Sequence, residues 1–291
     1  MHNVEAKGIL SAQNGMNIYR GCTHGCIYCD ARSTCYQMDH AFEDIEVKIN
    51  APELLEQALR KKRNRCMIGT GAMSDPYLHL EKDLQLTRRC LELIDEYGYG
   101  LAIQTKSDMI LRDLDLLKSI NKKTKCVVQM TLTTYDEKLC RILEPHVCTT
   151  ARRIEVLNIL KDEGIPTIVW LTPILPFIND TEENIRGLLD ECQKANVYGI
   201  NTFGIGVTLR DGDLHYFYQE LDEHFPGMKE RYIKTFGNAY ELPVPKEREQ
   251  MNLVRQMCEK NGIEWRTDAL FEYMHRFEDK QAGKQLSLFD L

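Results

Sequence analysis

Short apolar runs alternate with amphipathic stretches from Cys66 to about Arg210, and this alternation constrains the fold more than any other feature of the chain. Short apolar runs bounded by turn residues are typical of buried strands, and apolar residues at every third and fourth position predict helices. Regular alternation of the two predicts a parallel sheet with helices on its faces. We expect strands at residues 16–19, 67–71, 101–105, 127–133, 167–171 and 200–207.

Helices are expected to connect these strands. Their predicted positions are 82–96, from Asp108 onward, 151–163, and from Asp180 or Thr181 onward. Beyond Arg210 the pattern changes to an aromatic-rich segment at 215–236 and a helix at 245–261, which we interpret as a C-terminal extension. The alternation alone fits a doubly wound sheet as well as a partial barrel.

Three cysteines stand close together in the sequence Cys22-Thr-His-Gly-Cys26-Ile-Tyr-Cys29. Cysteine thiolates are the usual ligands of a [4Fe–4S] cluster. No fourth cysteine follows at ligand spacing, so one iron would be open to a ligand from outside the protein. The alternative is a structural zinc site with His24 or Cys35 as the fourth ligand, but such sites usually have two separated ligand pairs and this chain has no second pair.

Composition excludes some classes of protein. The formal net charge of −7 argues against a protein that binds nucleic acid through its own basic surface. The longest apolar run, 165–178, is interrupted by prolines, so we expect no membrane span. The N-terminus has no apolar signal core, and 11 cysteines without a secretion signal argue against a disulfide framework, so we expect a cytoplasmic protein.

The cysteine motif and several later stretches together resemble the spore photoproduct lyase-like branch of the radical S-adenosylmethionine (SAM) enzymes. The stretches that carry the resemblance are Tyr19 to Arg32, Thr70-Gly-Ala-Met-Ser-Asp-Pro-Tyr77, Thr105-Lys-Ser107, Glu144-Pro145, Pro173 to Pro176 and Asn179-Asp180. The resemblance as a whole extends from about Asn14 to Val207. The resemblance implies an α/β fold, a partial (β/α)6 barrel with a C-terminal extension over its open side, and an enzyme that uses a [4Fe–4S] cluster, SAM and an external electron donor. The domains expected are an N-terminal segment (1–13), the radical SAM core (14–210), the extension (211–277) and a tail (278–291).

The resemblance also assigns residues. Cys22, Cys26 and Cys29 would ligate the cluster, and the cofactor residues would be Tyr28, Ser74, Lys106 and Thr131. Ser74 and Lys106, at the ends of the second and third strands, would hold the methionine part of SAM, with the lysine ammonium paired to its carboxylate. Tyr28 would pack near the adenine, and Thr131 would reach the ribose.

Two positions depart from the repair enzymes of this branch. Ala72 stands where they carry a hydrogen-donor cysteine, and Asp30 stands where they place a tyrosine. These two departures predict poor repair of spore photoproduct. We expect an enzyme that cleaves SAM to a radical and uses it on a nucleic-acid lesion or a modified base in DNA or RNA. The alternatives are radical modification of a peptide or small metabolite, and a non-enzymatic iron–sulfur or zinc interaction module.

The chain ends in a polar tether followed by Gln-Leu-Ser-Leu-Phe, at residues 285–289. This pentapeptide resembles the peptide by which bacterial DNA polymerases and repair proteins bind the β sliding clamp. Leu288 and Phe289 would be the apolar anchors, next to Leu286, and Gln285 a polar contact. The alternative is a tail that folds back on the barrel.

Overall fold

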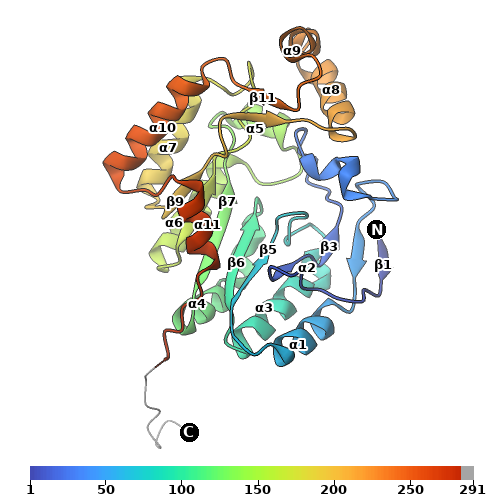
Figure 1. Cartoon of the computed structure of the whole chain (residues 1–291), viewed down its shortest axis with the longest axis vertical. Coiled ribbons are helices and arrows are strands. Elements are labelled where there is room, and N and C mark those ends of the chain that lie inside the picture. The colour runs from blue at the N-terminus through green and yellow to red at the C-terminus, as the bar shows by residue number, and fades with distance from the viewer. Residues whose placement is uncertain (283–291) are drawn as a thin grey trace, which may run out of the picture.

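A computed structural model describes residues 1–282 and contains one parallel sheet in the order β2–β5–β6–β7–β8–β9 (Figure 1). Its strands are β2 (Gly15–Met16), β5 (Met67–Thr70), β6 (Gly100–Thr105), β7 (Cys126–Thr131), β8 (Thr167–Trp170) and β9 (Gly199–Asn201). Within the described residues the edge strands β2 and β9 do not pair with each other, so the barrel is open. The predicted α/β fold with a partial six-stranded barrel is confirmed.

Amphipathic helices cover the outer face of the sheet. They are α1 (Ala51–Lys61), α2 (Glu81–Leu84), α3 (Leu86–Glu96), α4 (Leu114–Lys123), α6 (Thr150–Asp162) and α7 (Glu182–Lys194), whereas α5 (Glu137–Leu143) packs beside the cysteine loop. The apolar faces of the covering helices share one core with strand residues such as Ile68, Ile103 and Val128, all fully buried. A strand presents alternate side chains to opposite faces, which leaves the intervening residues for the inside of the barrel.

Two predicted elements differ from the structure. The helix expected at 82–96 is broken into α2 and α3 at Gln85, which has a left-handed φ of 52°. The strand expected at 200–207 is also divided, because Phe203 and Gly204 have φ values of 51° and 89° that no strand adopts. Only β9 joins the main sheet, and β10 (Gly206–Thr208) pairs antiparallel with β11 (Glu241–Pro243).

A C-terminal helix, α11 (Thr267–His275), fills the inside of the barrel near the amino ends of the strands (Figure 1). Leu270 and Met274 pack there with strand residues Met67, Ala102, Val127 and Ile168. Lys125 holds the end of this helix, since its Nζ donates to the carbonyl oxygens of Tyr273 (2.6 Å) and Arg276 (3.2 Å). In the described residues the amino end of the barrel is therefore filled, and the cavity described below opens toward the carboxyl ends of the strands.

Two further helices after β9 pack beside the cysteine loop, and a third packs elsewhere. Helices α8 (Asp213–His224) and α9 (Met228–Phe236) form an aromatic cluster in which Phe217 and Tyr232 are fully buried against Ile27 and Tyr28. Helix α10 (Glu247–Asn261) packs against α7. At the opposite end of the chain, β1 (His2–Val4), β4 (Glu46–Lys48) and β3 (Tyr19–Arg20) form a small separate sheet.

Among the described residues, no helix is long and apolar enough to cross a membrane. The predicted clamp-binding residues Gln285, Leu286, Leu288 and Phe289 lie outside the described residues, so that binding site stays a prediction.

We predict that Leu270→Ala lowers the free energy of unfolding by about 2–5 kcal/mol, because it leaves a cavity inside the barrel. Ile233→Ala is the control, since Ile233 is 48% exposed on α9, and it should cost no more than about 0.5 kcal/mol. Denaturant titration monitored by circular dichroism measures both. Equal losses for the two variants would show that α11 is not part of the barrel core.

Candidate active site

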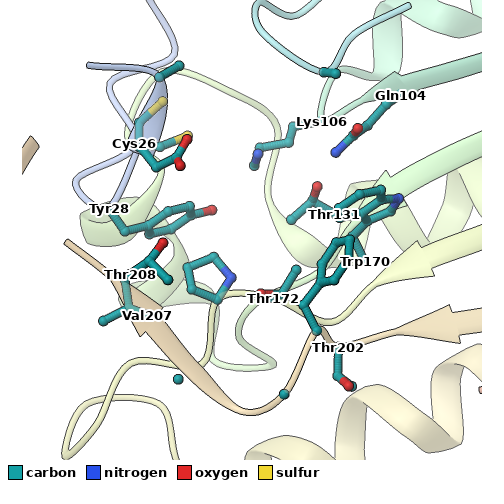
Figure 2. Close-up of a pocket in the computed structure, with 18 of the residues that line it drawn as sticks. Cys26, Tyr28, Gln104, Lys106, Thr131, Trp170, Thr172, Thr202, Val207 and Thr208 are labelled. Carbon is teal, nitrogen blue, oxygen red and sulfur yellow. The ribbon is translucent and has the colours of Figure 1, made fainter. Parts of the chain in front are cut away.

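A cavity of about 580 Å³ opens at the carboxyl ends of the strands. It is lined on one side by the cysteine loop and on the other by the strand ends, so that Cys26 and Tyr28 face Thr131 and Trp170 across it (Figure 2). All seven site residues predicted from the sequence line this cavity: Cys22, Cys26, Cys29, Tyr28, Ser74, Lys106 and Thr131. Cavities of this size typically hold a small molecule or cofactor.

The cysteine loop is held from both sides by backbone hydrogen bonds. The amide of Cys22 donates to the carbonyl of Phe42 (3.1 Å), and the amide of Ile27 donates to the carbonyl of Leu143 (3.0 Å). Gly25 has a φ of 69°, and a Cβ there would lie 2.9 Å from Cδ2 of His146. The loop therefore needs glycine at this position to pack against the segment after α5.

The three thiols are not gathered at the spacing that one bound zinc ion requires. Thiolates on a single zinc lie about 3.8 Å apart, by its tetrahedral geometry. Among the described residues, no set of three ligand atoms within 4.8 Å of one another includes these cysteines. His24 Nε2 lies 3.7 Å from Asp75, and the Cys35 thiol contacts Arg210; neither belongs to a close set of three ligand atoms with these thiols. Burial raises the pKa of Cys22 to about 12 and raises those of Cys26 and Cys29, so bound metal is needed to hold them as thiolates.

A buried ion pair connects the cysteine loop to the end of β7. Tyr28 donates its hydroxyl to Glu144. Arg153 is 2.6 Å from the same carboxylate, and both side chains are fully buried. Arg153 also donates to the carbonyl oxygen of Thr131 (3.0 Å). Burial alone would raise the pKa of Glu144, but the charges of Arg153 and Lys106 outweigh it and hold that pKa below its usual range.

Asp75 connects the ends of β5 and β6. Its carboxylate accepts hydrogen bonds from the Thr105 hydroxyl (2.7 Å) and from the Lys106 amide (2.8 Å). Ser74 donates to the carbonyl of Gly21 (2.6 Å), directly before the first cysteine. These contacts orient Lys106 toward the thiols. Burial by itself would lower the pKa of Lys106. The negative charges of Cys26 and Glu144 have the larger effect, so the pKa lies above its usual value and the ammonium is charged.

The far side of the cavity is aromatic and acidic. Trp170 and Phe203 lie with ring centroids 5.1 Å apart, and Phe203 is 56% exposed. Glu247 lies near Gly204 on this side, whereas Asp30 directly follows Cys29 and Glu241 pairs with Thr208 beside Tyr28 (Figure 2). Among the described lining residues Lys106 is the only lysine or arginine, so the cavity has one cationic position, beside the thiols, and carboxylates on both sides.

Sequence reasoning missed several of these residues. Asp75 and Glu144 lie within stretches that carried the resemblance, but no role was assigned to them. Arg153 was expected only as part of a helix, and Trp170 only as part of a strand. Trp170 could have been predicted to line the site, because it lies at the carboxyl end of a predicted strand and the active sites of barrels form at that end.

The fold and the site define a partial α/β barrel enzyme whose three-thiol loop faces the carboxyl edge of its sheet. The model of the Radical SAM superfamily matches residues 16–192, and the chain belongs to this superfamily. The cofactors of the superfamily are a [4Fe–4S] cluster and SAM, as predicted.

Solved structures and curated relatives agree with this assignment. The fold is that of a spore photoproduct lyase variant with dinucleoside spore photoproduct, at a TM-score of 0.62 and 16% identity over 89% of this chain and 78% of that one. An uncharacterised protein of Methanocaldococcus jannaschii is 35% identical over 176 residues, 60% of this chain and 65% of that protein. An uncharacterised protein of Mycobacterium tuberculosis is 28% identical over 86% of this chain and 75% of its own length. A radical SAM Nalpha-GlyT isomerase of Pseudomonas phage M6 is 25% identical over 58% of this chain and 34% of its own length.

We predict that Glu144→Gln lowers the free energy of unfolding by about 3–5 kcal/mol, because it leaves Arg153 as a buried unpaired charge. The control is Glu155→Gln on the same helix as Arg153. It breaks the exposed pair with Arg152 and should cost below about 1 kcal/mol. Urea titration of the two variants checks this, and a Glu144→Gln loss as small as the control would contradict the buried network.

Proposed function

We propose that this protein generates a 5′-deoxyadenosyl radical and uses it on a base of a nucleic acid that enters the cavity from its aromatic side. In this proposal Cys22, Cys26 and Cys29 ligate the cluster. Lys106 pairs with the SAM carboxylate, and Ser74, Tyr28 and Thr131 contact the rest of SAM. When bound, the cluster and SAM supply the radical. The observation that carries the proposal is the single charged lysine between the three thiols and the strand ends (Figure 2).

The chain's own residues then bind and orient the substrate. A base can stack on Trp170 and Phe203, since aromatic side chains are the usual platforms for unstacked bases. The acidic lining at Asp30, Glu241 and Glu247 repels phosphates, so we expect the base to enter while the backbone stays outside. Taking a base out of its stack is how enzymes reach atoms inside a nucleic acid.

Relatives support a nucleic-acid substrate more than a peptide. The solved structures of similar fold include spore photoproduct lyase with AdoMet and dinucleoside spore photoproduct, and one relative bears the name of a radical SAM Nalpha-GlyT isomerase. The clamp-binding segment predicted at 285–289 would bring such an enzyme to DNA. Dimer reversal itself is not proposed, because Ala72 replaces the donor cysteine and the described cavity lining has no cysteine beyond the three proposed ligands.

The experiment that tests the proposal is deuterium transfer after anaerobic cluster reconstitution. Oligonucleotides, RNA and peptides carrying deuterium on carbon are incubated with SAM and a reductant, and 5′-deoxyadenosine is analysed by mass spectrometry. We expect an oligonucleotide with a modified base to raise its formation and transfer deuterium, with Cys26→Ala inactive and spore photoproduct repaired poorly. Transfer from a peptide and from no nucleic acid would support the alternative substrate class instead.

We predict that Lys106→Met raises the KM for SAM by about 10- to 150-fold, the loss of one charged hydrogen bond. The value of kcat should change less, because the reacting atoms lie elsewhere. Lys118→Met is the control, since Lys118 forms a half-exposed pair with Glu163. Formation of 5′-deoxyadenosine at varied SAM concentrations measures both. A fall in kcat at unchanged KM would contradict the assigned role of Lys106.

A further inference from the structure

A second group of metal-binding side chains lies in the small N-terminal sheet, away from the cavity. His2 on β1 is the register partner of Glu46 on β4, and His40 lies in the segment that leads into β4. One ligand atom of each of the three side chains lies within 4.8 Å of the other two. None of them lines the cavity described above.

Each histidine has one ring nitrogen held by an oxygen. Nδ1 of His2 lies 3.0 Å from a carboxylate oxygen of Asp44, and Nδ1 of His40 lies 3.0 Å from the carbonyl oxygen of Ala41. An oxygen that accepts from Nδ1–H sets the tautomer in which Nε2 carries a free lone pair. Metal-ligating histidines almost always have such a partner on their other nitrogen.

The free nitrogen of His40 lacks the partner that a buried nitrogen normally has. Nε2 of His40 is buried and has no hydrogen-bond partner. The nearest carboxylate oxygen, on Glu46, is 3.8 Å away, too far for a hydrogen bond. Ligand atoms on one tetrahedral zinc ion lie about 3.4 Å apart. A metal ion between the two atoms would satisfy both.

We propose that His2, His40 and Glu46 bind one divalent transition-metal ion, for which zinc suits the ligand set best. Two imidazoles and one carboxylate are a common zinc ligand set, and the fourth position is left to water. In the proposed site both histidines ligate through Nε2. Asp44 orients His2, and its other oxygen accepts from the N-terminal amine (2.9 Å).

The site would stabilise the segment that supports the cysteine loop. Between His40 and Glu46, the carbonyl of Phe42 accepts the amide of Cys22. Glu46 is also the register partner of Arg20, two residues before that cysteine. A metal ion that joins β1 to this segment therefore holds the acceptor of a cluster ligand in place.

A second group of similar composition provides a matched control. Glu220, Glu223 and His224 also lie within 4.8 Å of one another. All three are on the single helix α8, and the side chain of Glu223 is 72% exposed. This group has no carboxylate or carbonyl on the other nitrogen of its histidine among the described contacts, and we do not propose it as a site.

Zinc binding to the cluster-loaded full chain tests the proposal. The unaltered protein and three variants are dialysed anaerobically against zinc; the variants are His40→Gln, Asp44→Asn and His224→Gln. Elemental analysis measures the bound zinc, and the zinc K-edge absorption spectrum identifies its ligands. We expect one zinc ion per chain with nitrogen and oxygen neighbours at about 2.0–2.2 Å. Asp44→Asn should weaken binding by about 10- to 100-fold, His40→Gln by more, and His224→Gln by less than about twofold.

Three outcomes would overturn the proposal. The first is sulfur neighbours at about 2.3 Å from the zinc, which would place it on cysteines. The second is equal zinc binding by Asp44→Asn and the unaltered chain. The third is no bound zinc in the unaltered chain or in any variant. If His40→Gln does not fold, Asp44→Asn still decides, because Asp44 is 42% exposed and contributes little to the core.

Discussion

The buried ion pair between Glu144 and Arg153 is the interaction on which the site depends. Both side chains are fully buried, and each has a further contact that fixes its place: Glu144 accepts from Tyr28 of the cysteine loop, and Arg153 donates to the carbonyl of Thr131. Removing one partner from such a pair leaves a buried charge without compensation. The loop that carries the thiols is therefore attached to the sheet whose strand ends form the opposite wall of the cavity.

In the part of the chain that the structure describes, the amino end of the barrel is filled and the carboxyl end holds the cavity. Helix α11 fills the amino end with Leu270 and Met274, and the aromatic cluster of α8 and α9 supports the cysteine loop from outside. What remains is a cavity with Lys106 beside the thiols, the rings of Trp170 and Phe203 on the opposite wall, and carboxylates on both sides. The lysine favours an anionic cofactor group beside the thiols, and the rings favour an uncharged substrate group, such as a base, on the opposite wall.

The sequence predicted those features that depend on local spacing. Strands at Met67, Leu101 and Thr167 follow from apolar runs, and Ser74, Lys106 and Thr131 lie where parallel strands end, so their meeting in one cavity was foreseeable. The division of the last strand was not, because the break in 200–207 depends on the left-handed φ of Phe203, a non-glycine residue whose identity does not predict such a conformation. The Glu144–Arg153 pair and the group of His2, His40 and Glu46 arise from tertiary packing and have no fixed sequence spacing.

The central claim is that Cys22, Cys26 and Cys29 hold a [4Fe–4S] cluster with one iron open to SAM. Electron paramagnetic resonance of the anaerobically reconstituted, dithionite-reduced protein tests this most directly. We expect a reduced-cluster signal from about four irons per chain, a change in its shape on addition of SAM, and no signal in Cys26→Ala. A signal that SAM leaves unchanged, or zinc in place of iron at the three thiols, would contradict the account.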